Sequence, residues 1–197
     1  MFKRLIIVMI LLSLFLVLNA QMMSQRQSKY RINLGLGFCG IFGEDVMHEN
    51  DGLEIASPSF AVGLSIVNDL KDQFVTFEPG IRHIMRGFSK NIAEGADEVE
   101  LKQNQISYID IFGKIKFGNK NVRVFTGTGV AIAPFTEYYN TFNIPVYLGL
   151  DWYPQELPFV LGIESDILLL DMPVKDVYTD FNKVKCYTVL ASFSYLF

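Results

Sequence analysis

The chain ends in Tyr187-Thr-Val-Leu-Ala-Ser-Phe-Ser-Tyr-Leu-Phe197, and this stretch decides the fold. Every second residue from Tyr187 to Phe197 is apolar or aromatic, and most of the residues between them are small and polar. A period of two residues is typical of a β-strand with one apolar face and one polar face. In a soluble protein such a strand would be an exposed edge that can pair with other chains, whereas in a transmembrane barrel it closes the sheet. We therefore expect this stretch to be the closing strand of a barrel.

The aromatic residue at the end of this strand has a second implication. A final amphipathic strand that stops at Phe197 resembles the signal by which outer-membrane barrels reach their assembly machinery. We therefore expect two partners, the barrel-assembly machinery through Phe197 and the surrounding outer-membrane lipid or lipopolysaccharide.

The start of the chain has the pattern of an export signal. Lys3 and Arg4 precede an apolar run from Leu5 to Leu18, and Ala20 follows as a small residue before a polar one. A basic start, an apolar run and a small residue at the cleavage site are typical of a secretory signal peptide. The run is shorter than the roughly 20 residues that a membrane-spanning helix needs. We expect a cleaved signal peptide over residues 1–20 and one outer-membrane barrel domain over residues 21–197.

Composition agrees with an exported barrel and excludes one class of partner. The sequence of 197 residues is 50% hydrophobic and 14% aromatic but only 19% charged, whereas soluble domains are roughly a quarter charged. Because no later run is long enough to span as a helix, the excess apolar content must lie in strands. The net charge of -4 gives no basic patch, so we expect no nucleic-acid partner.

Seven further segments alternate in the same way as the last one. The eight predicted strands cover residues 30–38, 59–66, 75–82, 108–117, 122–132, 144–152, 159–169 and 187–197. Connections after the second, fourth and sixth strands are short, whereas those after the first, third and seventh are long. Short turns on one rim and long loops on the other are typical of an up-and-down membrane barrel. The sequence predicts an all-β fold, a closed antiparallel barrel of about eight strands.

Two features decide which face of the strands points outward. The polar face is rich in glycine, which makes room for large neighbours inside a narrow barrel. The same face carries balanced charges, and buried charges must be paired. We predict a lumen network of ten residues: Arg31, Glu78, Arg82, Asp110, Lys114, Lys116, Arg123, Asp151, Glu164 and Asp166.

Aromatic residues of the apolar face gather near the ends of the strands. Such residues form girdles at the membrane–water boundary of outer-membrane barrels. The predicted girdle at one rim consists of Tyr30, Phe117, Trp152, Phe159, Tyr195 and Phe197.

Three motifs of the chain are similar to a known family. They are Phe77-Glu-Pro-Gly-Ile-Arg82 with the following Met85-Arg-Gly-Phe88, Tyr108-Ile-Asp-Ile111 with the following Lys114-Ile-Lys-Phe-Gly118, and Arg123-Val-Phe-Thr-Gly127. Together they resemble strands three to five of the PorT-like outer-membrane β-barrel domain family. The resemblance implies an outer-membrane barrel of unassigned activity, some relatives of which assist protein secretion.

Catalysis has little support in the residue pattern. By parity His83 faces lipid near the outer rim, where a lipid A deacylase-like barrel would carry a catalytic histidine. Such an enzyme also needs a serine nucleophile and an acid, but residue 85 is methionine and Ser89 lies past the strand end. A lipid-modifying enzyme that uses His83 stays the alternative, and we expect no enzyme, no cofactor and no metal site.

The acidic run between Glu44 and Glu54 lacks the spacing of a calcium loop. We therefore interpret it as a solvated external loop. Because about eight strands enclose an interior that side chains fill, any conductance should be small. The predicted function is a structural or interaction role, in which external loops meet an unknown partner, with an accessory role in secretion as its finer form.

The two cysteines lie near the predicted seam of the barrel. Cys39 follows the first strand and Cys186 precedes the last, and parity places both on the lumen face. Antiparallel neighbours at equal height could bring the two Cα atoms within the roughly 4.4–6.8 Å that a disulfide requires, although barrel shear could offset them by two residues. We therefore treat Cys39–Cys186 as a candidate disulfide.

Overall fold

The structure is a computed structural model that describes residues 28–43, 54–69, 74–94, 98–134, 142–154, 157–171, 174–175, 180–181 and 184–197. The eight long strands are β1 (Ser28–Gly43), β3 (Ser57–Asp69), β4 (Val75–Glu94), β5 (Glu98–Gly118), β6 (Val122–Ile132), β8 (Pro145–Trp152), β9 (Phe159–Leu168) and β12 (Val184–Leu196). Four two-residue strands lie in the connections: β2 (Glu54–Ile55), β7 (Phe142–Asn143), β10 (Val174–Lys175) and β11 (Asp180–Phe181).

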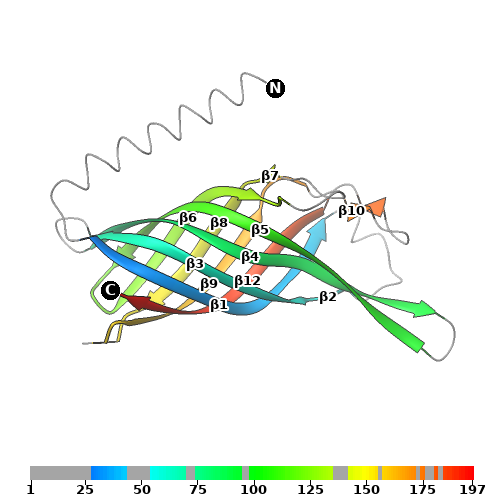
Figure 1. Ribbon diagram of the computed structural model, residues 1–197, viewed down its shortest axis with the longest axis horizontal. Coiled ribbons are helices and arrows are strands. Elements are labelled where there is room, and N and C mark those ends of the chain that lie inside the picture. Colours follow the sequence, from blue (N-terminus) through cyan, green and yellow to red (C-terminus); the bar gives the residue numbers. More distant parts are fainter. Residues whose placement is uncertain are drawn as a thin grey trace, which may run out of the picture.

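The eight long strands close into a barrel (Figure 1). Each pairs antiparallel with its neighbours in the order β4-β3-β1-β12-β9-β8-β6-β5, and pairing of β5 with β4 completes the circle. The first strand meets the last along a continuous seam, from Arg31 opposite Leu196 to Gly43 opposite Val184. The prediction of a closed antiparallel barrel of eight strands is confirmed.

The two ends of the barrel differ in their connections. We call the end with the short turns between β5 and β6 and between β8 and β9 the turn end, and the opposite one the loop end. The start of β1 and the C-terminus both lie at the turn end (Figure 1). Gly118 there adopts a φ of 148°, and the Asn119 side chain accepts hydrogen bonds from the backbone N–H groups of Asn121 and Val122 at 2.8 Å each.

Alternation along the strands puts apolar side chains outside and charged ones inside. Leu36 and Ile163, in the middle of β1 and β9, are 66% and 62% exposed, whereas Asp110 and Lys116 expose at most 1%. Among the outward positions described in the eight long strands, Lys185 near the loop end of β12 is the one Asp, Glu, Lys or Arg residue. This is the reverse of the pattern of a water-soluble barrel, which buries its apolar face.

The long connection predicted between the third and fourth strands is wrong, because the chain there continues as a β-ribbon. Strand β4 runs on to Glu94 and β5 begins at Glu98, and the two pair from Val75 opposite Phe117 to Glu94 opposite Glu98. This ribbon projects beyond the loop end in Figure 1. Two antiparallel strands can pair through backbone hydrogen bonds whether or not their side chains alternate in polarity, so a polar composition does not mark the end of a strand.

The two cysteines are free, so the candidate disulfide between them is not formed. Both thiols are fully buried on the lumen face and both strands lie at the seam. However, Cys39 pairs with Thr188 and Cys186 pairs with Ile41, an offset of two residues. Diagonal neighbours in a sheet lie roughly 7–8 Å apart, beyond the span of a disulfide. The stagger between the strands therefore separates the two thiols.

All six residues of the predicted girdle point outward near the turn end. Four of its rings and Phe193 form a continuous series across β1, β12 and β9. Ring centroids are 5.8 Å apart for Tyr30 and Phe197, 6.4 Å for Tyr195 and Phe197, and 5.5 Å for Phe159 and Tyr195. The other two, Phe117 and Trp152, are 39% and 47% exposed at the ends of β5 and β8. Together these residues define a band of exposed aromatic surface at one height.

Several predictions fall outside the described residues. They are the signal peptide over residues 1–20 and most of the acidic run, residues 44–53. Within the described ranges, no helix has the length and apolar character needed to cross a membrane.

We expect Phe197→Ser to weaken closure of the barrel. The Phe197 backbone exchanges hydrogen bonds with Tyr30 at 2.9 and 3.0 Å, and its ring stacks on Tyr30 and Tyr195. Loss of two aromatic contacts should lower the free energy of unfolding by about 1–3 kcal/mol. The measurements are the urea midpoint of the refolded barrel and the fraction of unheated protein that runs as a compact band on a denaturing gel. The control is Leu157→Ser, which changes a similarly exposed residue in a turn. Equal midpoints for the two variants would contradict the expectation.

Candidate functional site

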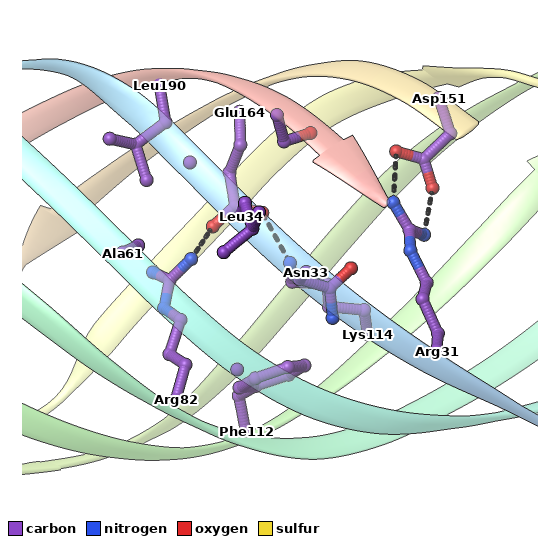
Figure 2. Close-up of a pocket in the computed structure, with 13 residues that line it drawn as sticks. Arg31, Asn33, Leu34, Ala61, Arg82, Phe112, Lys114, Asp151, Glu164 and Leu190 are labelled. Atoms are coloured by element: carbon purple, nitrogen blue, oxygen red, sulfur yellow. Dashed lines mark hydrogen bonds and ion pairs between the residues drawn. The ribbon is translucent and has the colours of Figure 1, made fainter. Parts of the chain in front are cut away.

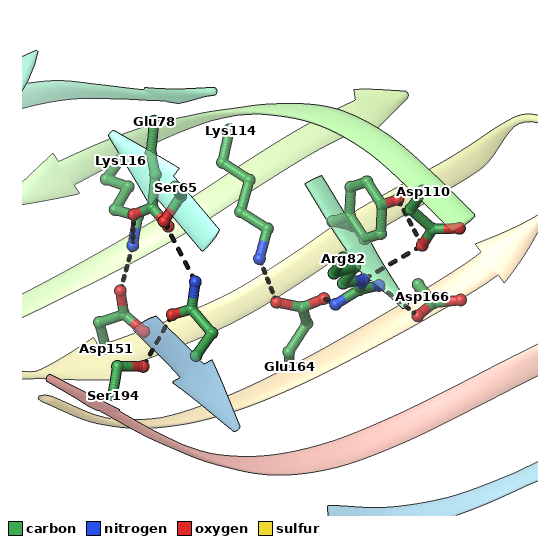
Figure 3. A network of polar contacts seen from close by, with 12 residues as sticks. Ser65, Glu78, Arg82, Asp110, Lys114, Lys116, Asp151, Glu164, Asp166 and Ser194 are labelled. Atoms are coloured by element: carbon green, nitrogen blue, oxygen red, sulfur yellow. Dashed lines mark hydrogen bonds and ion pairs between the residues drawn. The ribbon is translucent and has the colours of Figure 1, made fainter. Parts of the chain in front are cut away.

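The most distinctive chemistry of the molecule is the network of charged side chains inside the barrel (Figure 3). All ten residues of the predicted lumen network point inward, and none exposes more than 7% of its surface. They come from β1, β4, β5, β6, β8 and β9, so strands far apart in sequence meet through their side chains. The network divides into two groups along the barrel axis.

The turn-side cluster consists of Arg31, Glu78, Lys116 and Asp151. Arg31 Nη1 lies 3.2 Å from Glu78 Oε2 and 2.6 Å from Asp151 Oδ2. Lys116 Nζ makes ion pairs with the same two carboxylates. Two cations thus share two anions, and the cluster is neutral.

Polar side chains complete the turn-side cluster. Ser65 donates a hydrogen bond of 2.7 Å to Glu78, and Arg31 donates one of 2.9 Å to Ser194. Asn33 joins the two serines, donating to Ser65 at 3.1 Å and accepting from Ser194 at 2.8 Å. This circuit supplies partners for charges that have no access to bulk water, which is the condition for burying them.

The loop-side cluster consists of three cations and three anions, namely Arg82, Arg86, Lys114, Asp110, Glu164 and Asp166. Arg82 forms ion pairs with all three carboxylates, at 3.1 Å to Asp110 and to Asp166. Glu164 also pairs with Lys114, as Figures 2 and 3 show. This cluster is also neutral.

Arg86 is the functional residue that the sequence analysis missed. It is fully buried, and its guanidinium donates to both oxygens of Asp110 at 2.9 and 2.7 Å and to Asp166 at 3.1 Å. Its parity with Arg82 was a usable signal, since residues 82, 84 and 86 share a face. The signal was lost because the strand was predicted to end at residue 82.

Aromatic rings separate the cations from one another in the interior. The guanidinium of Arg82 lies 4.7 Å from the centre of the Tyr147 ring, and Lys114 Nζ lies 4.7 Å from that of Phe112 and 4.8 Å from that of Phe125. The Tyr147 hydroxyl donates a hydrogen bond of 2.9 Å to Asp110. Cation–π contacts gain strength when the cation is desolvated, as here.

Two glycines provide the space for these rings. A Cβ at Gly80 would lie 2.5 Å from the Phe112 ring, and one at Gly149 would lie 2.3 Å from the Phe125 ring. Both distances are far below van der Waals contact. The inward glycines therefore allow an eight-stranded barrel to hold large aromatic side chains.

The interior near the loop end is mainly apolar. A cluster of buried side chains extends there from the level of Ile84, with Phe88, Ile106, Tyr108, Leu168, Val184 and both cysteines, and the buried Ser57 and Thr188 lie beside it. Between the two ionic clusters the central cavity measures only about 30 Å³ (Figure 2), room for about two water molecules. The space between the two clusters therefore holds very little water.

The tenth predicted residue, Arg123, lies apart from both clusters at the turn end. Its Nη1 donates a hydrogen bond of 2.8 Å to Asp69 Oδ1, and its guanidinium lies 5.1 Å from the centre of the Tyr153 ring. Burial raises the pKa of the Tyr153 phenol, so the phenol keeps its proton at neutral pH.

His83 lies on the outside of β4. It pairs with Val62 in the middle of β3 and with Ile109 of β5, and Ile109 in turn pairs with Ile132 at the loop end of β6. Among the described residues no group of three His, Cys, Asp or Glu side chains could hold a metal ion.

Comparison with known proteins gives a likeness of fold only. No protein-family model and no curated protein match the sequence, so the resemblance to the PorT-like family stays a prediction. One similar solved structure is the crystal structure of Neisserial surface protein A (NspA). It has 10% identity and a TM-score of 0.48, over 85% of this chain and 97% of that one. Another is Ail, the attachment invasion locus protein of Yersinia pestis, with 12% identity and a TM-score of 0.48, over 87% and 99% of the two chains.

We expect removal of one charge from the loop-side cluster to destabilise the barrel strongly. Arg86→Met removes a cation that hydrogen-bonds both Asp110 and Asp166, and neither carboxylate has access to water in its place. Breaking a buried ion pair in this way should cost about 3–5 kcal/mol. The measurement is equilibrium unfolding in urea, and the control is Lys185→Met on the outside of β12, expected within about 0.5 kcal/mol of the wild type.

A double variant separates the charge effect from lost packing. Arg86→Met with Asp166→Asn restores neutrality to the cluster and should recover part of the loss. If Arg86→Met unfolded at the same urea concentration as Lys185→Met, the cluster would not be a closed ionic interior.

Proposed function

We propose that the protein is a small outer-membrane β-barrel that acts through its extramembrane segments rather than as a pore or an enzyme. One observation carries the proposal: the described outside of the barrel is mainly apolar, with Lys185 near the loop end as its one charged residue, and neutral ionic clusters fill the inside. A membrane solvates the apolar exterior, and the filled interior leaves no path for solutes.

The exterior supports location in a bilayer. Exposed side chains such as Leu36, Leu148 and Ile163 would be costly to leave in water all around the barrel. Aromatic rings at the turn end occupy the height at which membrane barrels carry a girdle. In bacteria, barrels of this size and pattern belong to the outer membrane, and the predicted signal peptide agrees with export.

The interior supports a role other than transport. Ionic clusters and aromatic rings occupy its middle, and the apolar cluster around Phe88 fills the loop end. Opening such an interior would expose several buried charges and break their pairs at once. The barrel therefore serves as a rigid support for what it carries at its ends.

The ribbon formed by β4 and β5 is the most extended structure that the barrel carries. On one side β2 pairs with β4, at Ile55 opposite Ser89 and Glu54 opposite Lys90. On the other side, the described pairing of β5 with β6 begins at Ile109. A two-stranded ribbon that projects from a barrel can serve as a docking surface for a partner, and an accessory role in secretion is the finer form of this proposal.

The alternative of a lipid-modifying enzyme that uses His83 gains no support from its surroundings. Across the neighbouring strands His83 faces the apolar residues Val62 and Ile109, rather than a serine or a carboxylate. A lipid A mass spectrum with and without the protein would test this alternative directly.

We expect the wild-type barrel to show no steady conductance in a planar bilayer. About two water molecules fit between the ionic clusters, and hydrated ions need a wider path. Single-channel recording is the measurement, with a refolded large porin as the positive control. Discrete, reproducible openings of the folded barrel would contradict the filled interior.

We expect removal of the ribbon to abolish partner binding and leave the barrel intact. Residues 89–103 are replaced by Asn-Gly, which favours a tight hairpin turn, so that Phe88 and Asn104 keep their pairing. Crosslinking in intact outer membrane should then lose the neighbours seen with the wild type, while the compact band on an unheated gel persists. Deletion of residues 135–141 is the control for loop shortening. Unchanged crosslinks after loss of the ribbon would contradict its role.

A further inference from the structure

The described lining of a pocket at the turn end has more cations than anions. The pocket has a volume of about 270 Å³, and its charged residues are Lys29, Lys120, Arg123 and Asp69. The two ionic clusters above it are each neutral. Among its described lining residues, the pocket therefore has three cations and one carboxylate.

One cation of the pocket is held rigidly. Arg123 donates to Asp69 and to Thr76 Oγ1 from Nη1 and, at 3.3 Å from Nε, to the Asn119 carbonyl. Its guanidinium also lies over the Tyr153 ring. Asp69 balances this charge, and Arg123 forms a fixed wall of the pocket.

The other two cations are the ones available to a ligand. Lys29 and Lys120 are exposed. Among the described residues neither makes an ion pair within 4.0 Å, although Lys29 interacts electrostatically with Asp69 at longer range. Lys29 lies two residues before the inward-facing Arg31 and shares its side of β1, and Lys120 occupies the turn between β5 and β6. They line the pocket from β1 and from the β5–β6 turn, as two donors available to one ligand.

We propose that this pocket binds a phosphate group. A phosphate carries up to two negative charges and several acceptor oxygens, which matches two free ammonium groups beside a fixed guanidinium. Lysine and arginine are the usual protein partners of phosphate. The apolar side chains of Val67 and Leu196 also line the pocket, so it has room and surface for the carbon skeleton of a phosphate ester. The inference does not depend on the proposed role of the ribbon.

Two sources could supply this phosphate, a soluble phosphate ester or the headgroup of a phospholipid at the rim. The test uses the refolded full-length barrel in an uncharged maltoside detergent, which contains no phosphate. Inorganic phosphate and dihexanoyl phosphatidylglycerol are titrated separately by calorimetry. Binding of inorganic phosphate assigns the site to soluble ligands, and binding of the lipid alone assigns it to a headgroup. Either outcome supports the proposal, and binding of neither probe overturns it.

Variants identify the site. Lys29→Ala and Lys120→Ala should each weaken binding by about three- to tenfold, since each removes one charge-assisted contact. Lys120→Arg keeps the charge and should retain most of the affinity. The matched control is Lys185→Ala, which removes a lysine from the outside of β12 at the loop end and should change nothing. Equal affinities in Lys29→Ala, Lys120→Ala and Lys185→Ala would place any binding elsewhere and overturn the proposal. All these residues lie at the surface, and a compact band on an unheated gel verifies that each variant is folded.

Discussion

Closure of the sheet around a narrow interior dictates how the charged side chains of this barrel are arranged. Eight strands leave no room for bulk water, so every charge inside must find its counter-charge on another strand. Arg31 of β1 meets Asp151 of β8, and Arg82 of β4 meets Glu164 of β9. These pairs join strands that are not hydrogen-bonded neighbours and so tie opposite walls of the barrel together. Loss of one partner leaves a charge that the membrane outside cannot solvate, so neutrality is maintained within each cluster as well as over the whole interior.

The large side chains fit inside the barrel because glycines lie opposite them. Gly80 and Gly149 leave space for Phe112 and Phe125, whose rings cover the cations from the side. An aromatic ring gives a desolvated cation a favourable contact without adding a charge that would itself need a partner. The exterior is simpler, because contact with lipid requires only apolar side chains, with aromatic rings at the membrane boundary.

The barrel is asymmetric along its axis. Apolar side chains fill the loop end around Phe88, and the β4–β5 ribbon extends beyond it. The turn end holds an open pocket beside Arg123, and the described lining of this pocket has more cations than anions. A neutral, filled middle isolates the two ends from each other. Each end can therefore carry its own binding surface, and the proposed roles of the ribbon and of the phosphate pocket are independent.

Alternation in the sequence by itself determined the fold class and the face of almost every residue. A strand places successive side chains on opposite faces, so parity assigned Asp110, Lys114 and the other predicted lumen residues to the inside. Parity does not give the height of a residue along the barrel axis, because that height depends on the stagger between neighbouring strands. Only the tertiary structure decided that Cys39 and Cys186 are offset by two residues and that Arg82 meets three carboxylates. Only it showed that β4 continues through Arg86 into the ribbon, because strand pairing is made by the backbone and does not end where the side-chain pattern ends.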